Sequence, residues 1–243
     1  RGFCVELITS DFSHGMKKFK EAPVDAYKSI ITYVHEPGYQ SNISFKRLYS
    51  HWKWGMNVGK YLNSHPVPDY IYCAIPSLTV ALKAGKYARR HNVKFIEDVQ
   101  DLWPEAFGLV IKNRFLRNVL LFPFKLYANR IYELADQVIA VSETYKNRAM
   151  SVRGNNGAGL GIYLGNDKVV FDSAKLKYHV DKPDDEIWLC YIGSLGYSYD
   201  IECVIDALDV VKKRGQVNRN IKFMIIGDGP LREKFTCYAN EKE

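Results

Sequence analysis

An apolar run ends abruptly in polar side chains in the segment FIEDVQDLWPEA, residues 95–106. The polar residues of this segment are Glu97, Asp98, Gln100, Asp101 and Glu105. A strand that only fills a core has no use for carboxylates at its exit, because an unpaired buried charge is costly. Carboxylates and a carboxamide can instead accept hydrogen bonds from substrate hydroxyls or take part in proton transfer. We therefore expect this strand exit to line a binding site.

Two glycine-rich segments offer a second kind of chemistry. In IIGDGPL, Gly227 and Gly229 allow a sharp turn and a close approach of the backbone to a ligand. Pro230 suits the first position of a helix, whose free N–H groups can bind an anion. The earlier segment IGSLGYSYD pairs Gly193 with Gly196 around Ser194. Plain tight turns explain both segments equally well, because neither matches the dinucleotide or P-loop fingerprint.

Short β-rich runs alternate with longer helical stretches along the chain. The expected strands are 5–10, 29–34, 70–74, 94–99, 137–142, 161–164, 187–193 and 221–227. The expected helices are 44–64, 77–91, 113–135, 143–151, 200–215 and 230–241, with Ser77 and Ser142 as N-caps and Gly215 as a C-terminal stop. This alternation predicts an α/β fold with open, doubly wound parallel sheets. The polar strand exits then lie along one edge of each sheet, where ligands of such folds bind.

One polar segment of weak periodicity interrupts the alternation. We expect an N-terminal Rossmann-like domain at residues 1–166, a linker at 167–186 and a second domain at 187–243. Two strands and two helices cannot complete a doubly wound sheet, so the second domain is expected to be incomplete. The chain starts almost directly in a strand and stops in a helix, and we expect it to be truncated at both ends.

Composition and charge narrow the classes of partner. The chain has 243 residues, 47% of them hydrophobic, and a net charge of +7 that is concentrated in the first 170 residues. This basic excess predicts an anionic partner such as a phosphate or a membrane surface. The five cysteines are widely spaced, so we expect mostly buried free thiols and a cytoplasmic protein. The six histidines show no metal-binding spacing, and we expect no metal site and no cofactor.

Residues 111–132 combine five basic residues with interleaved aromatic and aliphatic ones, and Pro123 should kink or divide the helix they form. Such a segment suits the surface of an anionic membrane, and a core helix with a solvated basic rim is the equal alternative. Residues 39–55 predict a loop followed by a helix. Taken alone, Asn42 and Arg47 are most plainly a cap and a solvated arginine.

Several segments in order resemble family-4 glycosyltransferases of the GT-B fold. They are PDYIYCAIPSLTVALKAGKYA, QDLWPEA, VIAVSETYK, YIGSLGYSYDIECVIDAL and IIGDGPL. The similarity is greatest to the bacterial subgroup that builds capsule, O-antigen or exopolysaccharide repeat units, and it runs over nearly the whole chain. The resemblance implies two Rossmann-like domains, the first binding the acceptor and the second the nucleotide-sugar, with a retaining transfer between them. It also implies that a first strand and a donor-site acidic segment lie outside these residues.

The resemblance assigns roles to residues of this chain. Asp101 and Asp98 are the candidate catalytic residues and would orient the acceptor hydroxyl. The candidate acceptor-binding residues are Gln100, Trp103, Glu105, Asn42, Arg47 and Ser142. The candidate donor-binding residues are Gly193, Ser194, Leu195, Tyr199, Gly227, Asp228, Gly229 and Pro230.

The chain departs from the family pattern at two places. Gln100 stands where many relatives carry a histidine, so this exit favours binding and orientation over proton transfer. Ser194 stands near the position of an arginine that neutralises the donor diphosphate, and no lysine lies between Ser194 and Cys203. A neutral loop stabilises a diphosphate less than two cations do.

The expected function is a retaining glycosyltransferase of bacterial surface polysaccharide synthesis. Its partners would be a nucleotide-sugar donor, a glycan or polyprenyl-linked acceptor and an anionic membrane surface bound through residues 111–132, without nucleic acid. It would lie in the cytoplasm or peripherally on the inner face of the membrane. The alternatives are a partner-dependent acceptor-binding subunit without activity of its own and a Rossmann enzyme that modifies sugar nucleotides.

Overall fold

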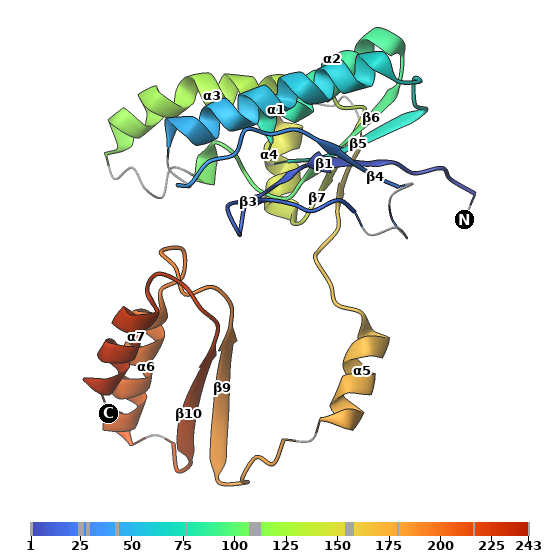
Figure 1. Ribbon diagram of the computed structural model, residues 1–243. Coiled ribbons are helices and arrows are strands. Elements are labelled where there is room, and N and C mark those ends of the chain that lie inside the picture. Colours follow the sequence, from blue (N-terminus) through green and yellow to red (C-terminus); the bar gives the residue numbers. More distant parts are fainter. Residues whose placement is uncertain are drawn as a thin grey trace. The chain divides into compact units, whose positions relative to one another are not determined.

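The computed structural model describes residues 2–23, 27, 30–41, 44–75, 77–106, 113–153, 158–178, 180–215 and 217–242. The chain divides into two compact units, Arg1–Gly165 (unit 1) and Asn166–Glu243 (unit 2). Figure 1 shows both units, with unit 1 in blue to yellow and unit 2 in orange to red. Each unit is described by itself.

Unit 1 contains a four-stranded parallel sheet in the order β5-β6-β7-β8. Its strands are β5 (Tyr70–Ile75), β6 (Lys94–Val99), β7 (Gln137–Ala140) and β8 (Ala158–Gly161). A separate parallel pair joins β1 (Leu7–Ser10) to β4 (Ile31–Val34), and a short antiparallel pair joins β2 (Phe12–Ser13) to β3 (Lys18–Phe19). The parallel pairing places the carboxyl ends of β5, β6 and β7 at one edge of their sheet.

Four helices accompany these strands in the described part of unit 1. They are α1 (Phe45–Ser64), α2 (Leu78–His91), α3 (Arg114–Leu134) and α4 (Glu143–Arg153). Ser44 caps α1, because its side chain accepts a hydrogen bond from the Arg47 amide. α1, α2 and α3 run alongside one another in Figure 1, and α1 packs on α2 through Gly55. A Cβ atom at Gly55 would lie 2.4 Å from Thr79 Cγ2, so only glycine permits this approach.

The main core lies between the sheet and these helices. Phe95, Val99 and Val138 point from β6 and β7 into it and are buried. On the opposite face, Tyr70 and Tyr72 of β5 are 63% and 59% exposed. The two faces of β5 therefore differ sharply, with Cys73 and Ile75 buried toward the helices.

Unit 2 consists of α5 (Lys168–Lys177) followed by a β-α-β-α segment. That segment contains β9 (Glu186–Ile192), α6 (Ile201–Arg214), β10 (Asn220–Ile226) and α7 (Arg232–Asn240), and β9 pairs with β10 in parallel. Its small core is formed by Leu195, Ile201, Ile205 and Phe235. Gly215 ends α6 in the left-handed conformation at φ 60°, as the sequence predicted.

The α/β class and the parallel sheets are confirmed, and β6 has the predicted bounds. The strand predicted at 161–164 is instead β8 at Ala158–Gly161. Helix α5 lies in the predicted linker, where its residues show weak periodicity because none of its described side chains is buried. Asp167 stabilises it locally by accepting hydrogen bonds from the amides of Val169 and Val170.

Two further sequence predictions are corrected, and a third is narrowed. Of the two outcomes predicted for Pro123, a kink or a division of the helix, the division does not occur, because α3 is a single helix that runs through the proline. Helix α7 begins at Arg232, two residues after the proline expected to start it. Cys4, Cys190, Cys203 and Cys237 are exposed and only Cys73 is buried, so the prediction of mostly buried cysteines was wrong. Within the described residues no helix is long and apolar enough to span a bilayer.

Candidate functional site

The exit of β6 holds two separate polar pairs. Gln100 Nε2 donates to Asp98 Oδ2 at 2.7 Å, and Trp103 Nε1 donates to Asp101 Oδ2 at 3.2 Å. Asp98 is buried and Asp101 half-buried, so each carboxylate is held by a neighbour only two residues away. Carboxylates fixed in this manner are suited to orienting a hydroxyl group.

Asp98 also faces the neighbouring strand. A hydrogen bond joins it to Tyr72 of β5, and burial together with this carboxylate raises the pKa of Tyr72 to about 12. The phenol therefore stays protonated at neutral pH and acts as a donor.

Cationic and aromatic side chains from several segments gather near the β6 exit, and α1 supplies Arg47 and His51. The Arg47 guanidinium lies 4.8 Å from the centre of the Trp103 ring and 5.5 Å from that of Tyr39. The Lys17 ammonium lies 4.3 Å from the centre of the Tyr39 ring, and the rings of His51 and Trp103 are 6.2 Å apart. Two of the predicted acceptor-binding residues, Arg47 and Trp103, are thus brought together. Cations stacked on aromatic faces suit an anionic group or a sugar ring.

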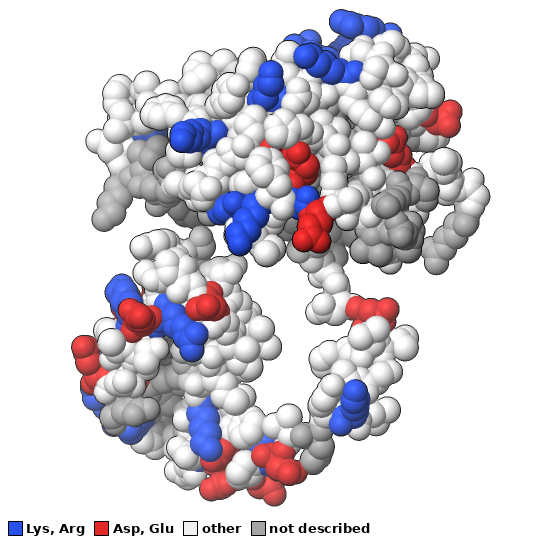
Figure 2. Space-filling view, viewed as in Figure 1, with Lys and Arg blue, Asp and Glu red and all other residues white. Residues whose placement is uncertain are grey.

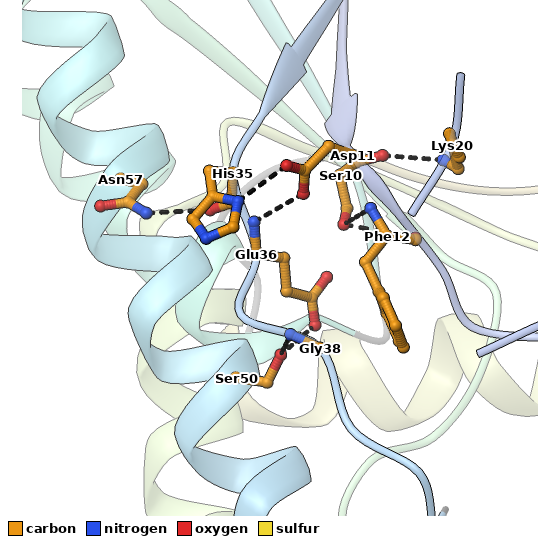
Figure 3. Close-up of polar contacts among 9 residues, drawn as sticks. All are labelled: Ser10, Asp11, Phe12, Lys20, His35, Glu36, Gly38, Ser50 and Asn57. Carbon is orange, nitrogen blue, oxygen red and sulfur yellow. Dashed lines mark hydrogen bonds and ion pairs between the residues drawn. The ribbon is translucent and has the colours of Figure 1, made fainter. Parts of the chain in front are cut away.

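A hydrogen-bond network, buried around Glu36 and Ser50, fixes the loops that follow β1 and β4 (Figure 3). The Asp11 carboxylate accepts from the Glu36 amide at 2.8 Å and contacts His35 Nδ1 at 2.7 Å. Ser50 of α1 donates to Glu36 Oε1 at 2.7 Å and accepts from the Gly38 amide at 3.0 Å. The network joins three segments that lie far apart in the sequence, so spacing alone could not predict it. The polar ends of these two strands, TSDFSHG and VHEPG, were the signal available.

Other predicted acceptor-binding residues have structural partners. Glu105 Oε1 accepts from Arg148 Nε at 2.6 Å, and this contact ties the β6 exit to α4. Ser142 accepts from the Tyr145 amide at 3.3 Å, as expected of the residue that precedes α4. Asn42 lies outside the described residues.

Glu97 differs from the other carboxylates of the β6 exit, because it points into the core. It is 0% exposed, and neither of its carboxylate oxygens has a hydrogen-bond partner among the described residues. Burial raises the pKa of Glu97 to about 8, although the charge of Arg153 lowers it somewhat. The Glu97 carboxylate is therefore closed off from any ligand that binds at this strand exit.

In unit 2 the two glycine-rich loops pack against each other. The Gly193 amide donates to Ile226 O at 3.0 Å, and the Leu195 amide donates to Asp228 O at 2.9 Å. A Cβ atom at Gly227 would lie 1.8 Å from Gly193 O, and one at Gly229 would lie 2.3 Å from Leu195 O. The glycines are thus required by the contact between loops, whatever ligand the loops bind.

The remaining predicted donor-binding residues differ in exposure. The side chain of Leu195 is buried in the core of unit 2, so only its backbone is available to a ligand. Tyr199 is half-exposed, with its ring 5.8 Å from that of Tyr191. Ser194 O accepts from the Tyr191 hydroxyl at 2.8 Å. Asp228 Oδ1 accepts from the Gly229 amide at 2.8 Å, and Pro230 lies in the turn before α7.

Solved glycosyltransferase structures are among those similar to this chain. The apo form of the lipopolysaccharide outer core galactosyltransferase WaaB is 20% identical with a TM-score of 0.49, over 87% of this chain and 49% of WaaB. Anabaena Alr3699/HepE in complex with UDP and glucose is 13% identical with a TM-score of 0.49, over 90% of this chain and 53% of HepE. Arabidopsis thaliana UGT89C1 complexed with quercetin is 11% identical with a TM-score of 0.42, over 82% of this chain and 55% of UGT89C1.

The chain spans about half the length of these structures. No protein-family model matches it, and neither does any curated protein sequence. Because every one of these TM-scores is below 0.5, the function proposed next rests on the residues of the chain itself.

Proposed function

We propose that this chain is part of a retaining GT-B glycosyltransferase that moves a sugar from a nucleotide-sugar to a glycan acceptor. Unit 1 would bind the acceptor, and the β9-α6-β10-α7 segment of unit 2 would bind the donor. The main observation behind this proposal is that Arg47 packs on the Trp103 ring, whose indole N–H donates to Asp101, at the carboxyl end of β6. The ordered set of family-like segments supports the same assignment.

The geometry supports acceptor binding in three ways. The Trp103 ring offers an apolar face on which a sugar ring can stack. Asp101 can accept a hydrogen bond from an acceptor hydroxyl, because the Trp103 indole fixes its other contact. Arg47 supplies a permanent positive charge for a phosphate of the acceptor.

The transfer itself needs little proton chemistry from the protein. The bond between the anomeric carbon and the diphosphate breaks while the acceptor oxygen bonds to the same carbon from the same face. The departing diphosphate takes the hydroxyl proton, and Asp101 positions that hydroxyl. Gln100 donates to Asp98 and cannot act as a base, which agrees with a positioning role for this exit.

Replacing Asp101 tests this assignment in the full-length protein that contains these residues. Asp101→Asn should lower the rate of sugar transfer to a lipid-linked acceptor roughly a hundredfold, because the hydroxyl is misplaced. The matched control is Asp69→Asn, at an exposed aspartate, which should transfer at the wild-type rate. Unchanged turnover in Asp101→Asn would remove Asp101 from the mechanism.

The donor is identified by a thermal-shift screen of UDP-, GDP- and dTDP-sugars on the same full-length protein. We expect one nucleotide class to raise the unfolding temperature. Stabilisation by the acceptor without stabilisation by any nucleotide-sugar would favour a partner-dependent acceptor-binding subunit. A sugar nucleotide that is chemically altered without an acceptor would favour an enzyme that modifies sugar nucleotides.

We further infer that α3 binds an anionic membrane surface on the cytoplasmic side, where a polyprenyl-linked acceptor would reside. Apolar side chains of α3 are exposed, which supports the membrane over a core helix with a basic rim; they include Phe115 (79%), Val119 (54%), Leu120 (49%), Phe122 (59%) and Leu126 (52%). Arg114, Arg117, Lys125 and Arg130 lie on the same helix. On the face shown in Figure 2, the basic side chains of unit 1 form several separate groups rather than one dense patch. The proposal therefore depends on the exposed apolar residues as well as on charge.

Vesicle sedimentation tests this inference. The double variant Phe115→Ser, Phe122→Ser should bind vesicles that contain phosphatidylglycerol at least tenfold more weakly than the wild type. Each change removes apolar surface that the membrane would bury on binding. The control is Phe45→Ser, at a residue of α1 that is 91% exposed. Equal binding by the wild type and the α3 variant would show that α3 does not contact the membrane.

A further inference from the structure

Three potential metal ligands meet at the loops that follow β2 and β4. They are His14, directly after β2, Glu36, after β4, and His51, in the second turn of α1. One ligand atom of each lies within 4.8 Å of the other two. The His14 Nε2 and Glu36 Oε2 atoms are 3.5 Å apart. Metal–ligand bonds of about 2.0–2.2 Å place tetrahedral ligand atoms about 3.4 Å apart, so this pair already has the required spacing.

Two buried polar atoms of this cluster have no hydrogen-bond partner among the described residues. Glu36 is 0% exposed, and its Oε2 atom has no hydrogen-bond partner among the described residues. The same holds for the Nε2 atom of His51. Burying such atoms without a partner costs about 1–3 kcal/mol each, and more for a charged group. A cation bound by both would remove that cost.

The other atoms of the ligands are held by neighbours. The Tyr39 hydroxyl lies 2.9 Å from His14 Nδ1, which leaves Nε2 of this imidazole directed at Glu36. Ser50 holds Glu36 Oε1 at 2.7 Å, and Figure 3 shows the Glu36 carboxylate extending toward α1. Ligands of protein-bound metals are commonly oriented by such outer contacts.

The charges around the cluster are of both signs. The buried Glu36 carboxylate would face any bound anion directly. The positive charges of Arg47, Lys17 and Lys20 oppose a bare dication, so the site rests on the geometry of the three ligands and not on the net charge around them.

We propose that His14, Glu36 and His51 bind one divalent transition metal ion of the Zn²⁺ class, with a fourth position open toward solvent. The His14 side chain is 42% exposed, and this exposure gives the ion a path into the site. Two imidazoles and one carboxylate form a ligand set that suits Zn²⁺. The spacing of histidines in the sequence predicted no metal site, because the ligands come from three segments. The metal site does not depend on the proposed transferase activity.

Metal content and affinity test the proposal on the untagged chain. After treatment with chelator and reloading with Zn²⁺, dialysed wild type should retain about one ion per chain by elemental analysis. His14→Ala and His51→Ala should each lower the affinity, measured against a chelating dye, by more than the roughly 10- to 100-fold expected for losing an outer contact. Reloading with Co²⁺ should give the visible absorption of a tetrahedral site in the wild type but not in His14→Ala or His51→Ala.

Matched controls separate this site from surface binding. His91→Ala removes an exposed imidazole that stacks on Tyr87, and it should bind Zn²⁺ as the wild type does. Glu36→Gln tests the carboxylate; far-UV circular dichroism first establishes that this variant folds, and His14→Ala stands in for it if it does not. Dialysed wild type without a stoichiometric ion would overturn the proposal. So would equal losses of affinity in His91→Ala and His51→Ala.

Discussion

Replacing Glu97 with glutamine is expected to make the unfolding free energy of unit 1 depend much less on pH. Glu97 is fully buried, and both carboxylate oxygens lack partners among the described residues. Its pKa is about 8 in the folded chain against 4.5 for an unperturbed glutamate, and burial is the main cause. The folded state therefore binds a proton that the unfolded state releases between these two values.

The sign and size of the effect follow from linkage. The stability that protonated Glu97 permits is fully present below pH 4.5 and is lost progressively as the pH rises toward 8. The loss is about 1.4 kcal/mol per pH unit in that window, so wild type should lose about 3 kcal/mol between pH 5 and pH 7.5 relative to Glu97→Gln. The comparison of the two proteins isolates Glu97, because His51, whose pKa is lowered to about 4, titrates in both.

Urea unfolding followed by tryptophan fluorescence measures this difference. The chain has four tryptophans, and in a Trp188→Phe background the remaining three all report on unit 1. Glu21→Gln, at an exposed glutamate, is the control and should follow the wild-type pH dependence. A constant difference in unfolding free energy between Glu97→Gln and wild type from pH 5 to pH 7.5 would refute the reasoning.

Three other outcomes follow from the packing. Gly229→Ala should destabilise unit 2 by about 1–3 kcal/mol through overpacking, because its Cβ would lie 2.3 Å from a carbonyl oxygen. Gly196→Ala, with no described atom within 4 Å of its Cβ, should not; equal unfolding midpoints in urea would contradict this. Native labelling with a disulfide reagent should modify four thiols quickly, and Cys73, which is buried with its pKa raised to about 12, only on unfolding. Arg153→Met should lower the unfolding free energy of unit 1 by about 1.5–3 kcal/mol, because the guanidinium donates to three carbonyl oxygens around the end of α3. The control is Arg90→Met, at an exposed arginine, and an equal effect of both changes would refute the assignment.

Elements with a strong local signal could be predicted from the sequence. β6 has the predicted bounds because a buried apolar run ends in polar residues, and α6 ends at a glycine that adopts the left-handed conformation. Helix α5 was missed because its stability comes from the Asp167 cap and an ion pair between Lys168 and Asp172. Hydrophobic periodicity carries no information about such contacts.

The candidate sites show the same limit more clearly. Arg47 and Trp103 could each be identified as binding residues, but their stacking depends on how α1 packs beside the β6 exit. The cluster of His14, Glu36 and His51 has no sequence signal at all, because its members belong to three segments. Spacing rules describe ligands on one element and fail where loops from different strands meet.

The alternation of side chains along β6 places its two carboxylates, Glu97 and Asp98, on opposite faces of the sheet. Successive side chains of a strand point to opposite faces, so Glu97 joins Phe95 and Val99 in the core while Asp98 lies on the face of Tyr72. A one-residue shift in register would turn Asp98 toward the core face that now holds Phe95 and Val99, and would turn Glu97 away from it. The acidic strand end is thus not a single array of ligand contacts. Burial favours the neutral form of the Glu97 carboxyl, and the Asp98 carboxylate is paired with a carboxamide and a phenol at the carboxyl end of the strand.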